Sequence, residues 1–220
     1  MVQPKTRNKI VDALMALAAE RPWDEVTLAL IAERADVTLA ALRAAYDGRL
    51  AIVADFTRRI DERVLEAVDL DMKGEGLRER LFDVLFSRFD HLDPHKPAIR
   101  NLGKAARHDP LLALELNRIV VGSMAWMLSA AGISATGGRG AFRAQGLALV
   151  WARAMRVWLK DDDPGRARTM AALDKHLRRA ERAVIRLNRL ERCISPCRCD
   201  HGGTARRPDM EGDIAEGHPS

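Results

Sequence analysis

Three cysteines and a histidine near the end of the chain are the residues whose types point most directly to chemistry. Cys193, Cys197, Cys199 and His201 could supply three thiolates and an imidazole, a ligand set that suits tetrahedral zinc. Their spacing matches no common zinc module, and the surrounding sequence lacks the apolar side chains that would enclose a metal. We therefore interpret residues 193–220 as a disordered tail, and we predict no bound metal and no cofactor.

Histidines and acidic residues elsewhere do not form a recognisable catalytic set. His91 and His95 flank Asp93-Pro94 with Asp90 nearby, a pattern that we interpret as an exposed loop and not as a metal site. The sequence has no His-Glu-x-x-His motif, no serine elbow, and no glycine-rich phosphate loop that follows a strand. We therefore predict that the protein is not an enzyme.

Two threonines stand where short helices are expected to begin. Thr27 precedes residues 28–34 and Thr38 precedes residues 39–45, so each hydroxyl can accept a hydrogen bond from a free amide of the first helical turn. A turn of about three residues around Asp36 separates the two helices. These lengths are those of a helix-turn-helix unit.

Composition favours an all-α protein. The 220 residues are 47% apolar and 5% aromatic, which is enough to form a core and too few aromatic residues to favour a sheet. Apolar residues recur at intervals of three and four positions, as expected of amphipathic helices. The expected helices cover residues 5–20, 28–34, 39–45, 49–70, 77–89, 98–107, 110–131, 141–160 and 164–191.

Charge is distributed unevenly along the chain, whose formal net charge is +5. Residues 1–70 carry ten basic and twelve acidic side chains, a net charge of −2, whereas residues 139–192 carry fourteen basic and six acidic ones. We interpret the basic excess as a solvated, arginine-rich face. Nucleic-acid binding by the N-terminal part must therefore depend on particular residues and not on its total charge.

The stretch of residues 119–138 contains no charged side chain and is long enough to span a bilayer. Its second half is rich in Gly, Ser and Thr, which favours a buried helix followed by a loop over a membrane span. All three cysteines lie in the tail, so no disulfide framework is expected, as is typical of a cytoplasmic protein. We predict a cytoplasmic location without membrane association.

The N-terminal residues resemble the TetR family of one-component regulators. The pattern is Thr27-x-x-x-Ile31-Ala32-x-x-Ala35-x-Val37-Thr38, followed by an aromatic residue at Tyr46 and a basic residue at Arg49. The resemblance implies a helix-turn-helix DNA-binding domain over residues 1–48, and a helical effector-binding and dimerisation domain over residues 49–192. It also implies a homodimer that binds a near-palindromic operator in double-stranded DNA, most often as a repressor.

The same resemblance assigns DNA-binding roles to seven residues. Thr38 and Arg43 are the polar candidates for base edges, and Leu39 or Ala40 could contact a thymine methyl group. Thr27, Arg43 and Arg49 are also expected to touch phosphates or to lie close to them. The full set is Thr27, Thr38, Leu39, Ala40, Arg43, Tyr46 and Arg49.

Three positions depart from the family's pattern. Asp36 stands where glycine is usual, and aspartate can adopt positive φ at moderate cost. Arg43 replaces a tyrosine of the recognition helix, and Gly48 replaces a serine. Because the recognition helix is rich in alanine, we expect few direct base contacts and a larger part for DNA shape and phosphates.

Methionine and aromatic residues of the C-terminal half are the candidates for binding a small lipophilic effector, because such side chains form adaptable walls. The predicted ligand-binding residues are Met124, Met127, Phe142, Trp151 and Met155. The last two long helices are expected to form the dimer interface by four-helix packing.

An alternative interpretation comes from residues 151–183, which are similar to the C-terminal part of a lipid-binding accessory protein of ubiquinone biosynthesis. The segments Trp158-Leu159-Lys160-Asp161-Asp162-Asp163 and Leu173-Asp174-Lys175-His176-Leu177 carry this similarity. It implies a quinone- or lipid-binding accessory protein with the same architecture and no role in DNA binding.

Overall fold

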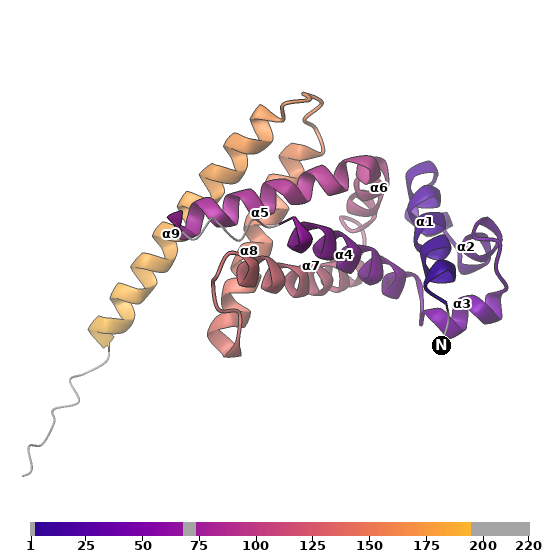
Figure 1. The fold of residues 1–220 in the computed structure, drawn as a ribbon, viewed down its shortest axis with the longest axis horizontal. Helices are drawn as coiled ribbons and strands as arrows, with labels where there is room; N and C mark the ends of the chain where they lie inside the picture. The colour runs from indigo at the N-terminus through magenta and orange to yellow at the C-terminus, as the bar shows by residue number, and fades with distance from the viewer. Residues whose placement is uncertain (1–2, 68–73, 195–220) are drawn as a thin grey trace, which may run out of the picture.

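The computed structural model describes residues 3–67 and 74–194, and over those ranges the chain is built from helices and their connections, without a β-strand (Figure 1). This agrees with the all-α prediction. The helices, including two short 3-10 turns named η1 and η3, are α1 (Pro4–Glu20), η1 (Trp23–Glu25), α2 (Leu28–Arg34), α3 (Leu39–Ala45), α4 (Arg49–Glu66), α5 (Leu77–Leu92), η3 (Asp93–His95), α6 (Lys96–Ala105), α7 (Pro110–Ala130), α8 (Gly137–Trp158) and α9 (Ala167–Ile194).

Side-chain caps fix the starts of α2 and α3, as the sequence predicts, and also the start of α7. Thr27 Oγ1 accepts from Leu30 N at 3.2 Å, and Thr38 Oγ1 accepts from Ala41 N at 3.1 Å. Asp109 Oδ1 accepts two amides at the start of α7, each at 3.0 Å, and Pro110 follows it in the first turn. These caps satisfy amides that have no partner within the helix.

Asp36 forms the turn between α2 and α3 with φ at 53°. This is the left-handed conformation that glycine adopts most easily and that aspartate tolerates better than most residues. The prediction that Asp36 adopts positive φ in this turn, in place of the usual glycine, is therefore confirmed.

Several predicted helix ends were wrong, and the start of α9 is the most informative. The Asp163-Pro164 pair does not open that helix, because Arg166 has φ at 50° and the helix begins at Ala167. Two aspartates cap the helix: Asp163 Oδ2 accepts from Ala167 N at 3.2 Å, and Asp161 Oδ2 accepts from both N and Oγ1 of Thr169 at 2.9 and 2.7 Å. The Thr169 hydroxyl thus adds a second donor that a local Asp-Pro pattern does not reveal.

Other boundaries differ by a few residues. Helix α5 continues to Leu92, the expected loop at 93–97 is η3 followed by the start of α6, and α8 begins at Gly137 instead of residue 141. The predicted extension of α4 through residues 68–70 lies outside the described residues. So does the predicted tail from residue 195 onward, with Cys197, Cys199 and His201; α9 carries the backbone through Ile194.

The first three helices form a small unit at one end of the molecule, which we call the head, and α5 and α7–α9 form the larger body (Figure 1). Helix α4 contacts α1 in the head and both α5 and α7 in the body. A second connection joins α6 to α1, where Asn101 Nδ2 donates to the Ala18 carbonyl at 3.0 Å. The head is therefore attached to the body by two helices.

Each part has its own apolar centre. In the head, apolar side chains of α1, α2 and α3 are buried together, and they are Ile10, Leu14, Leu17, Ile31, Ala32 and Leu42. In the body, the ring of Phe89 lies 4.4 Å from Trp151 and 5.4 Å from Trp158, centroid to centroid. Val37 lies half-buried at the edge of this apolar centre of the head.

A buried ion pair joins α4 to the body. Arg88 of α5 donates to Asp61 of α4, and the Ser123 hydroxyl of α7 donates to the same carboxylate at 2.8 Å. The Arg88 guanidinium also lies 5.3 Å from the centre of the Trp151 ring. Burial lowers the pKa of Arg88 to about 9, because removal from water disfavours its charged form.

We predict that Asp61→Ala lowers the free energy of unfolding by about 3–5 kcal/mol, because it leaves the Arg88 charge buried without a partner. The measurement is urea unfolding followed by circular dichroism. The double variant Asp61→Leu with Arg88→Met should recover most of the loss, since it removes both charges. A single variant as stable as the wild type would contradict this account.

Candidate nucleic-acid interface

Helix α3 presents an outward surface made of four of the predicted residues. Thr38, Leu39, Ala40 and Arg43 are all exposed, whereas Leu42 on the opposite side of the helix is buried in the head. The periodicity of the helix therefore separates a packing side from a side that faces solvent. Thr27 is exposed as well, at the start of α2.

Arg43 is the only charged side chain of α3, and its neighbour moderates that charge. Arg43 Nη1 lies 2.5 Å from Asp47 Oδ1 in an ion pair that both partners expose to solvent. Exposed pairs of this kind contribute roughly 0–1 kcal/mol. The guanidinium can therefore exchange this partner for another acceptor at small cost.

Tyr46 is placed differently from the other predicted residues, because it is only 5% exposed. Its hydroxyl donates to Asp55 Oδ2 of α4, and the Arg7 guanidinium of α1 lies 4.5 Å from the centre of its ring. The tyrosine therefore fixes α3 against α1 and α4 and does not project from the surface.

Asp55 is the centre of this network. Besides the tyrosine hydroxyl, it accepts from Arg58 Nε at 3.1 Å and from Arg59 Nη2 at 3.0 Å, and Arg7 Nε lies 3.6 Å away. Burial alone would raise the pKa of Asp55, but the hydrogen bonds from Tyr46 and the arginines outweigh it and lower the pKa to about 2. The carboxylate is therefore charged at neutral pH, whereas burial and its hydrogen bond raise the pKa of Tyr46 to about 12.

Arg49 also has partners inside the protein. Its Nη1 donates to the carbonyls of Trp23 at 2.6 Å and Val26 at 2.8 Å, and its guanidinium lies 4.7 Å from the centre of the Trp23 ring. Arg49 thus ties the start of α4 to η1. The sequence motif identifies Tyr46 and Arg49 as important residues. Only their partners in the structure show that both hold the helices of the head in place.

Arginines line a groove beside the last turn of α3. This groove, of about 860 Å³, is bounded by Gln3, Pro4, Arg7, Asn8, Ala44, Arg58, Arg59, Glu62, Arg63 and Glu66. Four of these side chains are basic and two are acidic. Although residues 1–70 have a negative net charge, the surface next to α3 is therefore locally basic.

None of the five predicted ligand-binding residues lines the arginine-lined groove or a second groove, between α4 and α7. Met124, Met127 and Trp151 are buried in the core of the body, Met155 is half-buried, and Phe142 is exposed. The groove between α4 and α7, of about 530 Å³, has a different lining that the sequence analysis did not select. Its residues are Ala54, Thr57, Arg58, Asp61, Glu62, Leu65, Arg118, Ile119, Gly122, Ser123 and Trp126.

The lining of this α4–α7 groove is partly apolar and partly polar. Trp126, Ile119 and Leu65 contribute apolar surface, and Asp61 and Ser123 come from the buried ion-pair cluster. Within the residues that the structure describes, no three His, Cys, Asp or Glu side chains lie close enough to hold a metal ion.

No protein-family model matches the sequence, and no curated protein matches it either. Solved structures do. The TetR transcriptional regulator from Nitrosomonas europaea ATCC 19718 has a TM-score of 0.62 and 22% identity, over 80% of this chain and 97% of that one. A TetR transcriptional regulator from Rhodococcus sp. RHA1 has a TM-score of 0.56 and 16% identity, over 80% and 95%. A tetR-family transcriptional regulator from Streptomyces coelicolor has a TM-score of 0.51 and 17% identity, over 86% and 90%.

The buried network yields a pH-dependent prediction. Tyr46→Phe should lower the free energy of unfolding at pH 7 by about 1.5–3 kcal/mol, because it removes a hydrogen bond to a charged group. The pKa of Asp55 is about 2 in the folded state, below the ordinary aspartate value of 3.8, so this stabilisation is complete above about pH 4 and is lost as pH falls toward 2.

Urea unfolding at several pH values measures this difference. The gap between the wild type and Tyr46→Phe should shrink as pH falls from 4 to 2. Ser129→Ala removes another hydroxyl, one that is exposed and donates to the Ala125 carbonyl, and its effect should not vary over this range. A pH-independent gap for Tyr46→Phe would contradict the assignment.

Proposed function

Starting from the TetR-family fold, we propose that this protein is a DNA-binding transcriptional regulator that acts as a homodimer. The single observation that carries the proposal is the outward surface of α3. Thr38, Leu39, Ala40 and Arg43 face solvent, while Tyr46 and Leu42 hold the same segment rigidly against the head. A short helix that is exposed on one side and fixed on the other suits insertion into a major groove.

The chemistry of these side chains suggests how DNA would be read. Arg43 can donate two hydrogen bonds to a guanine, and Leu39 or Ala40 can contact a thymine methyl group. Thr27 and Thr38 expose hydroxyls that can donate to the backbone phosphates. With one charged side chain on α3, we expect DNA shape to contribute much of the specificity.

The arginine-lined groove supports the electrostatic part of the proposal. Arg7, Arg58, Arg59 and Arg63 gather next to the last turn of α3, so the field beside the reading surface attracts a duplex. Partners inside the protein occupy part of their hydrogen-bonding capacity, so their role is long-range attraction. Each head would then bind one half-site of a near-palindromic operator.

Regulation would come from a small lipophilic effector in the body, with repression as the resting activity. The α4–α7 groove is the proposed site, because its wall includes α4, the helix that leads to the head. An effector that favours one position of α4 would shift the separation of the two heads. Since half-sites lie roughly 34–36 Å apart, a small shift weakens binding at both. Such a protein needs no cofactor and would act in the cytoplasm.

The quinone-binding alternative receives no comparable support. The three solved structures reported above are all named transcriptional regulators. The alternative also leaves the exposed surface of α3 without a role.

Selection from random DNA duplexes tests the proposal. The full chain should enrich a near-palindromic sequence at moderate salt. Arg43→Ala should weaken binding to that sequence at least tenfold, because each of the two heads loses a bidentate contact to guanine that contributes about 1–3 kcal/mol. Arg156→Ala, which removes an exposed arginine of α8, is the matched control and should bind as the wild type does.

Two results would overturn the proposal. One is the absence of any enriched sequence from folded, wild-type protein. The other is equal loss in Arg43→Ala and Arg156→Ala, which would indicate non-specific attraction to DNA. Arg49 is not used here, because its bonds to Trp23 and Val26 make loss of binding and loss of folding indistinguishable.

A further inference from the structure

Two exposed carboxylates flank the outward surface of α3. Asp36 lies in the turn before the helix and Asp47 lies just after it, and their side chains are 95% and 91% exposed. Carboxylates on a surface that meets phosphates weaken its attraction to DNA. A role that outweighs this loss must therefore come from what these side chains contact.

Of the two carboxylates, only that of Asp47 contacts Arg43. Arg43 Nη1 donates to Asp47 Oδ1 at 2.5 Å, whereas the carboxylate of Asp36 lies 3.6 Å from Lys9 of α1. Asp47 lies beyond the end of α3, in the connection to α4, so its pair with Arg43 does not follow from helical spacing alone. The buried Tyr46 precedes Asp47 and fixes the backbone at this point.

The pair leaves most of the Arg43 guanidinium available. Arg43 makes no second hydrogen bond or ion pair to any residue that the structure describes. The Nε and Nη2 atoms of a guanidinium lie on one edge, and their two parallel N–H groups fit a bidentate acceptor. Because Asp47 binds Nη1, this edge stays free and its orientation is restrained from the other side.

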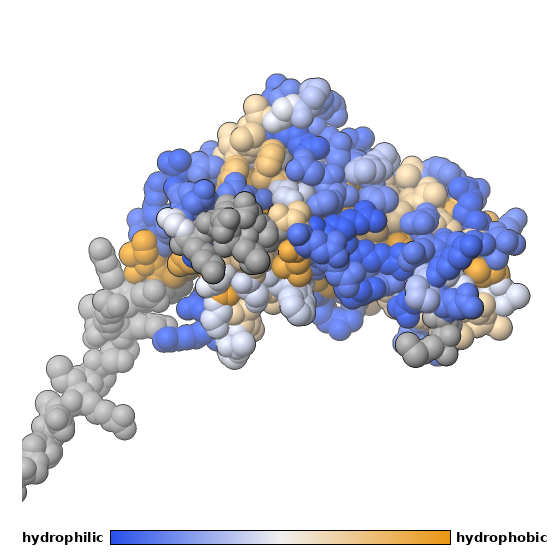
Figure 2. Space-filling view, viewed as in Figure 1, coloured by the Kyte–Doolittle hydropathy of each residue, from blue (hydrophilic) through white to orange (hydrophobic). Residues whose placement is uncertain are grey.

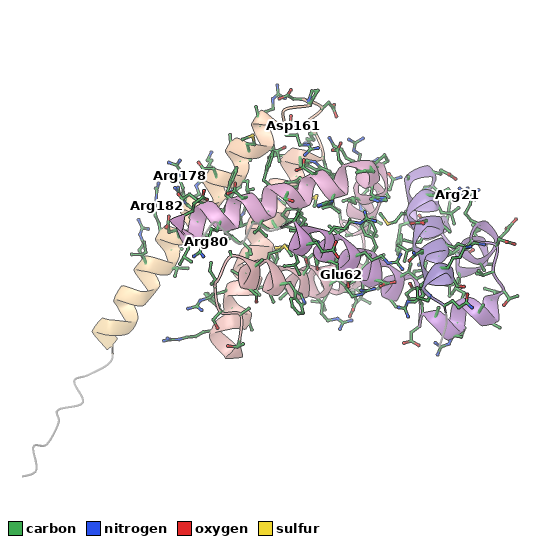
Figure 3. The ribbon with its side chains drawn as sticks, viewed as in Figure 1. Arg21, Glu62, Arg80, Asp161, Arg178 and Arg182 are labelled. Carbon is green, nitrogen blue, oxygen red and sulfur yellow. The ribbon has the colours of Figure 1, made fainter. Side chains whose placement is uncertain are left out.

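A different ion pair in the head has a structural role. Arg34 of α2 donates to Glu20 of α1 with both terminal nitrogens, at 2.9 and 2.6 Å, and so joins two helices. Glu20 precedes Arg21, which Figure 3 shows at the end of α1 that lies away from α3. The pair of Arg43 and Asp47 joins no two helices, and exposed pairs of its kind add little to stability. The fold therefore does not depend on it.

We propose that Asp47 makes the protein selective for its operator by holding Arg43. The inference rests on the proposed function and names a residue that determines its specificity. On a random duplex, Arg43 gains little by leaving Asp47 for a phosphate, because one anionic acceptor replaces another. At the operator, the free edge of Arg43 meets N7 and O6 of a guanine while Nη1 keeps its bond to Asp47, so a contact is gained and none is lost.

The charge of Asp47 acts in the same direction. Non-specific binding depends on the number of phosphates that basic side chains neutralise. Because Asp47 neutralises Arg43, the pair carries no net charge and contributes little to this attraction. Hydrogen bonds to a base edge do not require a net charge on the pair. Asp47 therefore lowers the affinity for every duplex, and lowers it least at the operator.

Competition between the duplex that the selection enriches and a scrambled duplex of the same length tests the inference. The ratio of the two dissociation constants, measured at one salt concentration, is the specificity. Asp47→Ala should raise the affinity for the scrambled duplex about tenfold, because each of the two heads gains an unpaired cation. The affinity for the enriched duplex should rise by no more than about threefold, because Arg43 loses its orientation. The specificity should therefore fall.

Two controls separate holding of Arg43 from loss of charge. Asp36→Asn removes a carboxylate beside α3 that does not contact Arg43, and asparagine also tolerates the positive φ of this position. It should raise the affinity for both duplexes alike. In an Arg43→Ala background, Asp47→Ala should likewise leave the specificity unchanged, because the side chain that Asp47 holds is absent.

Urea unfolding should give the wild-type midpoint for Asp47→Ala and Asp36→Asn, since both side chains are exposed. A lowered midpoint for Asp47→Ala would assign the pair to the fold and contradict the inference. Unchanged specificity in Asp47→Ala would overturn it, as would an equal fall in Asp36→Asn or in the Arg43→Ala background. Failure of the wild type to enrich any sequence would reject the proposed function and this inference with it, whereas normal enrichment with unchanged specificity in Asp47→Ala would reject the inference alone.

Discussion

The geometry of the head depends on one buried carboxylate. Asp55 of α4 accepts from Tyr46, Arg58 and Arg59 and is near Arg7, so it joins the end of α3, the start of α1 and α4 at one point. An unpaired carboxylate at this depth would be costly, and the surrounding donors keep it charged. The outward direction of α3 is therefore a consequence of satisfying this group. The second buried carboxylate of α4, Asp61, joins α4 to the body in the same way, by accepting from Arg88 of α5 and Ser123 of α7.

Local patterns were sufficient to predict the elements of the head. Threonine caps, an aspartate in a left-handed turn, and apolar residues at helical spacing are properties of neighbouring residues, and the structure has them where the sequence places them. Partners that are distant in the sequence could not be predicted in this way. Arg49 bonds to carbonyls 26 and 23 positions away, and nothing at position 49 itself indicates that its donors are occupied.

The body shows a second limit, because apolar composition does not say what covers an apolar residue. Met124 and Phe142 look alike as candidates for a ligand site, yet one is fully buried and the other projects into solvent. The view in Figure 2 shows a surface that is largely hydrophilic over α4 and α5, with separate apolar patches. Which apolar residues of the body reach the surface, such as Leu114 and Trp126 of α7, becomes clear only once the helices are packed.

The side chains of α6 join parts of the molecule that are far apart in the sequence. Asn101 bonds to the end of α1, whereas Arg100 and Lys96 donate to the carbonyls of Leu159 and Asp161 at the corner between α8 and α9. The head is thus attached to the body through two separate helices, α4 and α6. Because the head cannot turn without moving against both, these attachments restrict how it can reorient relative to the body.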